Sequence, residues 1–225
     1  MNAHDGNHGT DRANRKTSIE RPRGRPADTK SGEFQTSLLN SAESLFSENG
    51  YAATSVRSVA DRAGVNPALV HYYFGTKHDL LMAVIDRALQ PMADGISAIR
   101  ASGSSRLEDF AELFFNMAAE HPAMPKLITR EVLLSSGETK DIFARDYAPK
   151  IGGALPALLS KEQKDGRINA AYDPGAASLM LLSLCIFPFI ARSLAEPILG
   201  IDFGSDGTKT IKRHVVNVLQ RGMTT

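Results

Sequence analysis

The chain has 225 residues, of which 42% are hydrophobic, and a formal net charge of +1. This length fits one ordinary domain or two small ones, and this apolar content excludes wholesale disorder. A single cysteine excludes an intramolecular disulfide and indicates a reducing compartment, so we expect a cytoplasmic protein.

Residues 1–30 are polar, lack an apolar signal region and show no helical period, so they are predicted to form a flexible arm. Seven basic residues stand against four acidic ones in this segment. Its RPRGRP stretch (21–26) resembles the core of an AT-hook, in which Arg23 and Arg25 would enter an A·T-rich minor groove. The alternative is a solvated tail that adds only nonspecific charge.

Residues 54–77 have the pattern of two short helices joined by a glycine turn. Thr54 is predicted to cap the first helix and Gly64 to end it. Asn66 is predicted to cap the second helix, with Pro67 in its first turn, where a missing N–H costs nothing. Helix, turn, helix is the arrangement that places the second helix in the major groove of DNA.

Two stretches carry a resemblance to a known family. AESLFSENGYAATSVRSVA (42–60) and AGVNPALVHYYFGTKHDLL (63–81) resemble the DNA-binding signature of TetR/AcrR-family transcriptional regulators. The similarity covers roughly residues 34–84. The family usually has an aromatic residue where this chain has His71, and often a basic residue where it has Pro67, which leaves the operator sequence open.

The outer face of the second short helix is predicted to read bases. Its residues are Asn66, Pro67, Ala68, His71 and Tyr72. His71 and Tyr72 are expected to donate to phosphates or bases, and ordinary packing is the alternative, which we favour for Tyr73. Phosphate contacts are predicted at the starts of the flanking helices, and the resemblance implies the same roles. These residues are Thr54, Ser55, Arg57 and Lys77.

The predicted fold is all-α with about nine helices, because no period-two alternation is long enough for a strand. Three segments follow: the arm (1–30), a three-helix helix-turn-helix domain (31–78), and a larger ligand-binding and dimerisation domain (79–225). The main expected helices cover residues 32–48, 77–89, 141–164, 173–195 and 208–220, and breaks within 141–164 are indicated by Pro149, Gly152, Gly153 and Pro156. Thr76 and Asp79 are predicted to cap the second of these, and Pro91 to bend or break it.

The longest apolar run, 176–191, is shorter than the about 20 residues of a membrane span, so we expect a buried helix and no membrane partner. The resemblance implies a homodimer built from residues 173–195 and 208–220. Apolar candidates for that interface, which could equally lie in the monomer core, are Leu179, Leu182, Ile186, Ile190, Ile211, Val215 and Val218.

The resemblance also implies an inducer pocket among the middle helices. Apolar walls with a few polar groups describe such a site, although they describe most helical cores as well. The candidate lining residues are Phe114, Met117, Phe143, Tyr147, Met180 and Phe187, with Arg130 and Glu131 as polar anchors.

The resemblance implies a ligand-responsive repressor that binds a palindromic DNA operator as a homodimer and is released by a small hydrophobic effector. The alternatives are an activator and an architectural DNA-binding protein without an inducer. No phosphate-cradling loop, HExxH set or nucleophile elbow is present in the sequence, so we expect no enzyme, no cofactor and no metal site. Cys185, between Leu184 and Ile186, is expected to be buried and inert rather than redox-sensing.

Overall fold

The computed structural model describes residues 27–103 and 106–223, and within these ranges every regular element is a helix. Eleven α-helices lie in these ranges, with one π-helical segment and one short 3-10 segment among them. The prediction of an all-α fold is therefore confirmed, although about nine helices was too few. Two predicted helices are each divided, 141–164 between residues 147 and 154 and 173–195 near Ala191.

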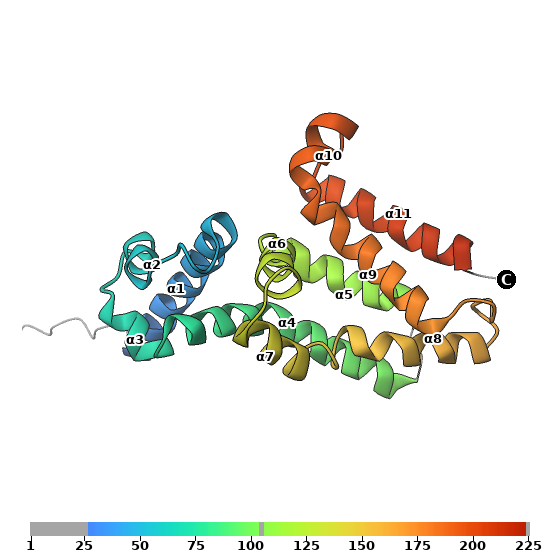
Figure 1. Cartoon of the computed structure of the whole chain (residues 1–225), viewed down its shortest axis with the longest axis horizontal. Coiled ribbons are helices and arrows are strands. Elements are labelled where there is room, and N and C mark those ends of the chain that lie inside the picture. The colour runs from blue at the N-terminus through green and yellow to red at the C-terminus, as the bar shows by residue number, and fades with distance from the viewer. Residues whose placement is uncertain (1–26, 104–105, 224–225) are drawn as a thin grey trace, which may run out of the picture.

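The first three helices form a small head at one end of the molecule (Figure 1). They are α1 (Ala27–Asn49), α2 (Val56–Ala63) and α3 (Ala68–Phe74). Since α1 begins before residue 32, residues 27–30 belong to a helix and not to the predicted arm. The head is held together by fully buried apolar side chains, namely Leu38, Ala42, Phe46, Val59, Ala60 and Val70.

The cap of α2 is Ser55 and not Thr54. Ser55 Oγ accepts the Ser58 N–H at 3.0 Å, and Ser58 Oγ accepts the Ser55 N–H at 3.1 Å. Thr54 is buried, and its hydroxyl lies within hydrogen-bonding distance of the Gly50 carbonyl (2.8 Å) and the Leu45 carbonyl (3.1 Å). The predicted cap is wrong by one residue because Thr54 closes the turn after α1 instead.

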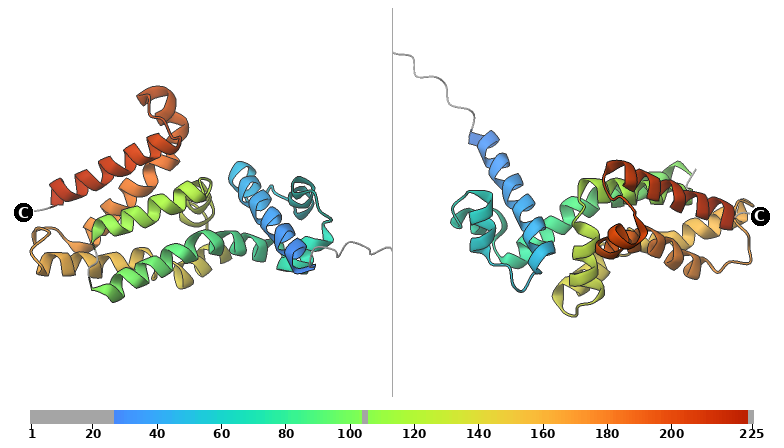
Figure 2. Two further views of the ribbon diagram at one scale, coloured as in Figure 1. Left: turned by 180° about the vertical axis from the view of Figure 1, so that it is seen from behind. Right: turned by 90° about the horizontal axis from the view of Figure 1, so that it is seen from above.

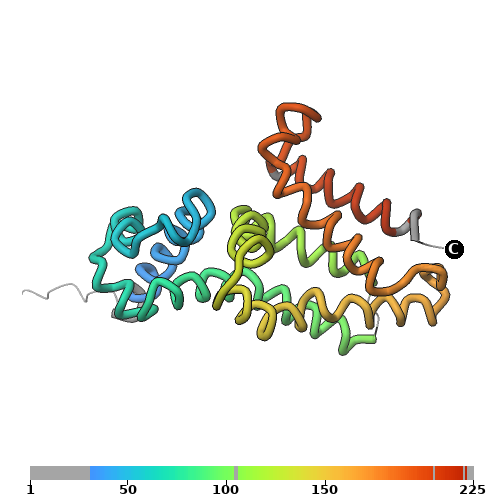
Figure 3. The backbone as a smooth tube through the Cα atoms, viewed as in Figure 1, coloured from blue at the N-terminus to red at the C-terminus, as the bar shows by residue number. Residues whose placement is uncertain are grey.

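The helix α4 (Lys77–Ser102) is 26 residues long and joins the head to the larger domain (Figure 3). Thr76 and Asp79 form the predicted capping box at its start. The predicted end near residue 89 is wrong, because the helix continues through Pro91. Pro91 is exposed, whereas residues on both sides of it, such as Met92, are buried, so core packing offsets the hydrogen bond that proline removes.

The larger domain is a helical bundle in which α4 and α5 contact each other, α8 lies against α9, and α11 covers α5 and α9 (Figure 2). Its elements after α4 are α5 (Leu107–Glu120), α6 (Met124–Ile128), η1, a π-helical segment (Thr129–Leu133), α7 (Glu138–Asp146), η2, a 3-10 segment (Gly152–Ala154), α8 (Leu155–Lys164), α9 (Pro174–Ile190), α10 (Arg192–Leu199) and α11 (Ser205–Met223).

The predicted helix over 173–195 divides into α9 and α10, which meet at an angle of 75°. Its start is as predicted, since Asp173 Oδ1 accepts the Ala176 N–H at 2.8 Å. The apolar sequence continues across the bend, which is why periodicity alone did not reveal it. Over the described ranges, no single helix is long and apolar enough to cross a membrane, and α9 and α10 reach that length only together across the bend.

Candidate nucleic-acid interface and effector cavity

Helix α3 buries one side in the head and turns the other to solvent. Val70 is fully buried, and Leu69 and Phe74 pack against the same core. On the opposite side His71 is exposed, and Tyr72 has 78% of its surface exposed. The Tyr72 ring is therefore available to a partner surface.

The side chain of Asn66 contacts the start of α3, although the residue that immediately precedes the helix is Pro67 and not the predicted Asn66. Asn66 Oδ1 accepts the Ala68 N–H at 2.8 Å, and Pro67 already has helical dihedrals (φ −53°, ψ −28°). Gly64, with φ 68°, ends α2 in the left-handed conformation that the sequence predicted. Ala68 is exposed and Pro67 is half-buried, so this end of α3 offers apolar surface to a partner.

One nitrogen of His71 is already engaged within the head. Its Nδ1 lies 2.8 Å from the Gly75 carbonyl, and a carbonyl can only accept, so Nδ1 carries the proton. Nε2 is the nitrogen left for a partner. It accepts from a base amino group when the ring is neutral and donates when the ring is protonated.

Tyr73 packs inside the head, as favoured from the sequence. Its hydroxyl lies 2.9 Å from Ser31 Oγ on α1, and its ring meets Tyr72 edge to face at 5.0 Å. The two neighbouring tyrosines therefore differ in direction, and Tyr72 alone of the pair is exposed.

Two of the four predicted phosphate contacts face solvent. Ser55 is exposed at the start of α2, and the Arg57 side chain is 85% exposed. Arg57 Nε lies 3.9 Å from Asp61 Oδ2, a loose surface pair that leaves the guanidinium free to move toward a phosphate. Arg23 and Arg25 lie outside the described residues.

The other two predicted phosphate contacts point into the head. The Thr54 hydroxyl is buried, as described above. Lys77 Nζ donates to the carbonyls of Tyr51 (2.9 Å) and Thr54 (3.0 Å) and lies 4.2 Å from the centre of the Tyr51 ring. Lys77 therefore stabilises the turn between α1 and α2, which corrects its predicted role at a phosphate.

A cavity of about 350 Å³ lies within the larger domain, and each residue that lines it has an apolar side chain or is a glycine. Of the predicted lining residues, Phe114, Met117 and Phe143 are present there. Several other lining residues were not predicted, because their sequence pattern does not differ from that of ordinary core or connecting residues: Leu89, Met92, Phe110, Pro125, Ile128, Leu133, Ile151 and Gly152. Leu182 and Ile186, expected at the dimer interface or in the core, also line it.

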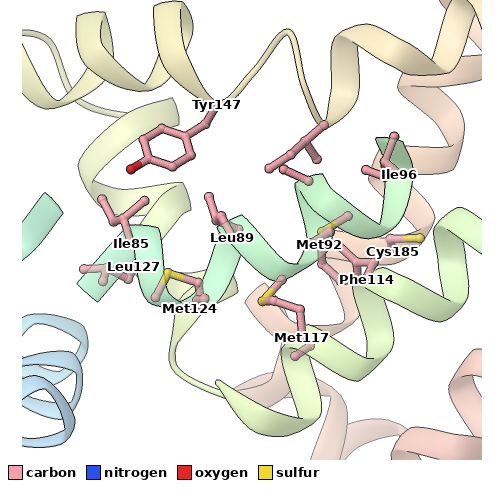
Figure 4. Close-up of a cluster of buried hydrophobic side chains, with 14 of the residues drawn as sticks. Ile85, Leu89, Met92, Ile96, Phe114, Met117, Met124, Leu127, Tyr147 and Cys185 are labelled. Atoms are coloured by element: carbon pink, nitrogen blue, oxygen red, sulfur yellow. The ribbon is translucent and has the colours of Figure 1, made fainter. Parts of the chain in front are cut away.

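Tyr147 borders this region without lining the cavity (Figure 4). Its hydroxyl donates to Asp86 Oδ1 at 3.0 Å, and its ring stacks on Phe143 at 5.8 Å. Burial, and then the hydrogen bond to Asp86, raise the pKa of Tyr147 to about 12. The phenol is thus already paired, which corrects its predicted place in the cavity wall.

Arg130 and Glu131 do not line the cavity either. Arg130 Nη2 donates to the Asn49 carbonyl at 2.9 Å, and Glu131 Oε1 accepts the Tyr51 N–H at 3.0 Å. Both side chains therefore reach from the π-helical segment to the turn after α1. Their predicted role as polar anchors for a ligand is wrong, because they join the two domains instead.

Comparisons with known proteins agree with this arrangement. The profile of bacterial regulatory proteins of the tetR family matches residues 38–84, and that of the tetracyclin repressor-like C-terminal domain matches residues 104–219. The chain belongs to the TetR family. TetR-family proteins are transcriptional regulators with a DNA-binding helix-turn-helix, so this chain is a DNA-binding transcriptional regulator and not an enzyme.

Two TetR-family relatives and one solved structure show how similar individual proteins are to this chain. The transcriptional regulator EthR of Mycolicibacterium smegmatis is 29% identical over 150 residues, 64% of this chain and 68% of the relative. The transcriptional repressor NicS of Pseudomonas putida is 22% identical over 178 residues, 76% of this chain and 83% of the relative. The fatty acid degradation regulator FadR from Bacillus halodurans shares the fold, with a TM-score of 0.64, 18% identity and coverage of 84% and 95% of the two chains.

The remaining candidates divide between the outer surface and the core of this TetR-family bundle. Met180 and Phe187 are 59% and 65% exposed on α9, so they do not line the cavity as predicted. Of the other predicted interface residues, Val215 is buried in the core and Ile211 packs against it, whereas the exposed ones are Leu179, Ile190 and Val218.

Cys185 is fully buried, and burial raises the pKa of its thiol to about 12. The reactive thiolate is therefore disfavoured, as expected for an inert cysteine. In the described ranges, no group of three or more His, Cys, Asp and Glu side chains is arranged to hold a metal ion.

Proposed function

We propose that this chain is a cytoplasmic repressor that binds a palindromic operator as a homodimer and is released by a small apolar effector. The observation that carries the proposal is the path of α4. This helix begins at Lys77 beside α3 and contributes Leu89 and Met92 to the cavity wall. A ligand that favours one position of α4 would therefore bias the position of α3, provided that it binds the two forms unequally.

The exposed face of α3 supports DNA recognition by a small number of contacts. Tyr72 and His71 offer a phenol and the second imidazole nitrogen, and Ser55 and Arg57 lie at the start of the supporting helix. A single short helix gives modest sequence discrimination. Two copies that read half-sites about 34 Å apart would increase it, which is the reason to expect a palindrome.

The homodimer is supported by apolar side chains on the outside of α9, α10 and α11. A large exposed apolar patch usually marks an interaction surface. Helix α10, which the sequence analysis did not separate from α9, adds to it. The most exposed members are Leu179, Met180, Phe187, Leu194, Ile198, Leu199 and Val218.

The effector class is argued from the cavity. Its volume of about 350 Å³ is at the lower end of the range for small-molecule sites, and its wall has no charged or hydrogen-bonding side chain. A charged group buried there would lack a partner, which is costly. The effector is therefore a compact apolar molecule, or one that inserts only its apolar part.

Repression is supported by the relative NicS, which is a transcriptional repressor. An activator and an architectural protein are the alternatives. DNase footprinting of the DNA upstream of the gene that encodes this chain, together with a transcription assay, distinguishes the three. We expect a short palindromic footprint overlapping the promoter and lower transcription on binding. Higher transcription would indicate an activator, and long unspecific coverage would indicate an architectural protein.

A further inference from the structure

The turn between α1 and α2 is held by side chains that come from outside the head. Arg130 Nη2 donates to the carbonyl of Asn49, the last residue of α1, and Glu131 Oε1 accepts the Tyr51 N–H at 3.0 Å. Carbonyls at a helix C-terminus have no partner within the helix, so the guanidinium supplies one. Arg130 Nε and Glu131 Oε1 also lie 3.5 Å apart, which keeps the two side chains together.

The glycine between these two contacts fits this arrangement. Gly50 has φ 88°, and a methyl group added there would collide with the Arg130 guanidinium. The guanidinium therefore lies directly against the turn. From this turn the chain continues through Thr54 into α2, where the exposed Ser55 and Arg57 begin the predicted phosphate-binding end.

The same segment forms part of the cavity wall. Arg130 and Glu131 belong to the π-helical segment, whose five-residue turn is closed by the Leu134 N–H donating to the Thr129 carbonyl at 2.9 Å. Ile128, which directly precedes this segment, and Leu133, its last residue, line the cavity. Isolated π-helical turns occur frequently at functional sites. Here one such turn contacts the cavity on one side and the head on the other.

We infer that Arg130 and Glu131 form a clamp through which the helix-turn-helix senses the filling of the cavity. The inference rests on the proposed function and names its positioning residues. When the cavity is empty, the clamp fixes the α1–α2 turn. When the cavity is filled, Ile128 and Leu133 are displaced, and the clamp releases Asn49 and Tyr51. This route reaches the head directly and does not depend on a movement of α4.

Amide hydrogen exchange of Tyr51 tests the clamp without DNA or effector. Glu131→Ala is expected to speed exchange of the Tyr51 N–H about tenfold relative to wild type, which is within the usual range of coupling between sites. Glu131→Gln, which keeps an acceptor oxygen, should stay near wild type. Arg145→Ala is the control for the loss of an ion pair elsewhere, because Arg145 is an exposed residue that pairs with Asp146 on α7.

Cavity filling is tested with two variants. Ala148→Phe adds a ring at the cavity wall, and Gly152→Leu adds a side chain whose first carbon has ordinary room against Leu182 (3.5 Å). Each is expected to speed Tyr51 exchange about tenfold, and to add little when combined with Glu131→Ala. Exchange of the Val70 amide, deep in the head, reports whether the head itself has unfolded.

Unchanged Tyr51 exchange in either folded filled variant would overturn the clamp. If Ala148→Phe and Gly152→Leu both fail to fold, Glu131→Ala decides the matter. Tyr51 exchange in Glu131→Ala equal to that in wild type would also overturn the clamp. The proposed function fails separately, if no operator is found or no apolar compound alters its binding. Fast exchange in the filled variants together with that failure would mean that the clamp exists but serves another signal.

Discussion

Tyr72 and His71 illustrate how side-chain direction sets the chemistry of the DNA-facing surface. Tyr72 presents a phenol that is mostly exposed, whereas Tyr73 beside it is held by Ser31. The hydrogen bond from His71 Nδ1 to the Gly75 carbonyl leaves Nε2 as the ring nitrogen available to a partner. We therefore expect Tyr72 to contribute to DNA affinity and His71 to contribute to the choice of bases.

Tyr72→Ala should weaken operator binding about tenfold or more, roughly 1.4 kcal/mol, because it removes an exposed contact. The free energy of unfolding should change by less than about 0.5 kcal/mol, since so little of the ring is buried. Gel shift and urea denaturation measure the two effects. Tyr172→Ala, at another exposed tyrosine, is the control, and equal binding by Tyr72→Ala and wild type would remove Tyr72 from the interface.

Tyr147 gives a prediction about pH. Its pKa of about 12 in the folded chain exceeds the value of about 10 for an unfolded tyrosine. The native state thus favours the protonated phenol, and this stabilisation is full below about pH 10 and lost as the pH rises toward 12. Tyr147→Phe should cost about 1 kcal/mol at pH 8, with the difference from wild type shrinking by pH 11.

Urea denaturation of both proteins at the two pH values measures this difference. Because other groups titrate equally in wild type and variant, only the change in the gap between them is informative. A gap that stays constant from pH 8 to pH 11 would show that the Tyr147 phenol is not stabilised in its protonated form.

Direction also explains which contacts the sequence could not predict. Thr54 and Lys77 lie at turns next to helices, and Arg130 lies in the short π-helical segment. At such positions a helical period does not predict which way a polar side chain points. Each of the three points toward backbone carbonyls: Thr54 toward those of the turn after α1, and Lys77 and Arg130 toward carbonyls of segments distant along the chain. Only tertiary structure brings those carbonyls within reach, so local pattern assigned all three residues to a ligand or to DNA.

At the scale of elements, caps depend on residues within one turn, so the sequence predicted three helix starts, although it misplaced the cap of α2 by one residue and the start of α1 by about five. The Thr76–Asp79 box, the Asn66 contact and the Asp173 cap were all confirmed. Helix ends depend on distant packing and were less predictable. The continuation of α4 through Pro91 and the bend between α9 and α10 are the clearest cases.

The N-terminal segment is predicted to contribute to operator binding through its arginines. Deleting residues 1–26, which leaves α1 whole, should lower operator affinity and flatten its dependence on salt. If Arg23 and Arg25 each neutralise one phosphate, the slope of log K against log salt should fall by about 1.8. Arg23→Ala/Arg25→Ala in the full chain should reproduce most of this change, and an unchanged slope would favour the solvated tail.

At the scale of the whole molecule, the two domains are joined by more than one link. Helix α4 is continuous between them, and the Arg130–Glu131 clamp joins the π-helical segment to the α1–α2 turn. A third link is Glu43 Oε2 of α1, which lies 2.7 Å from Arg87 of α4 and 2.8 Å from His121 after α5. A change in the cavity therefore has short mechanical routes to the surface that carries Tyr72.

Operator affinity measured against a titration of apolar compounds tests the central claim most directly. Compounds whose binding to the chain is established by fluorescence should be compared in wild type and in Ala148→Phe, in which the cavity is partly filled. We expect at least one compound to weaken operator binding by wild type about tenfold or more at saturation, and to act less on the variant. Unchanged operator affinity with every compound that binds would contradict the account.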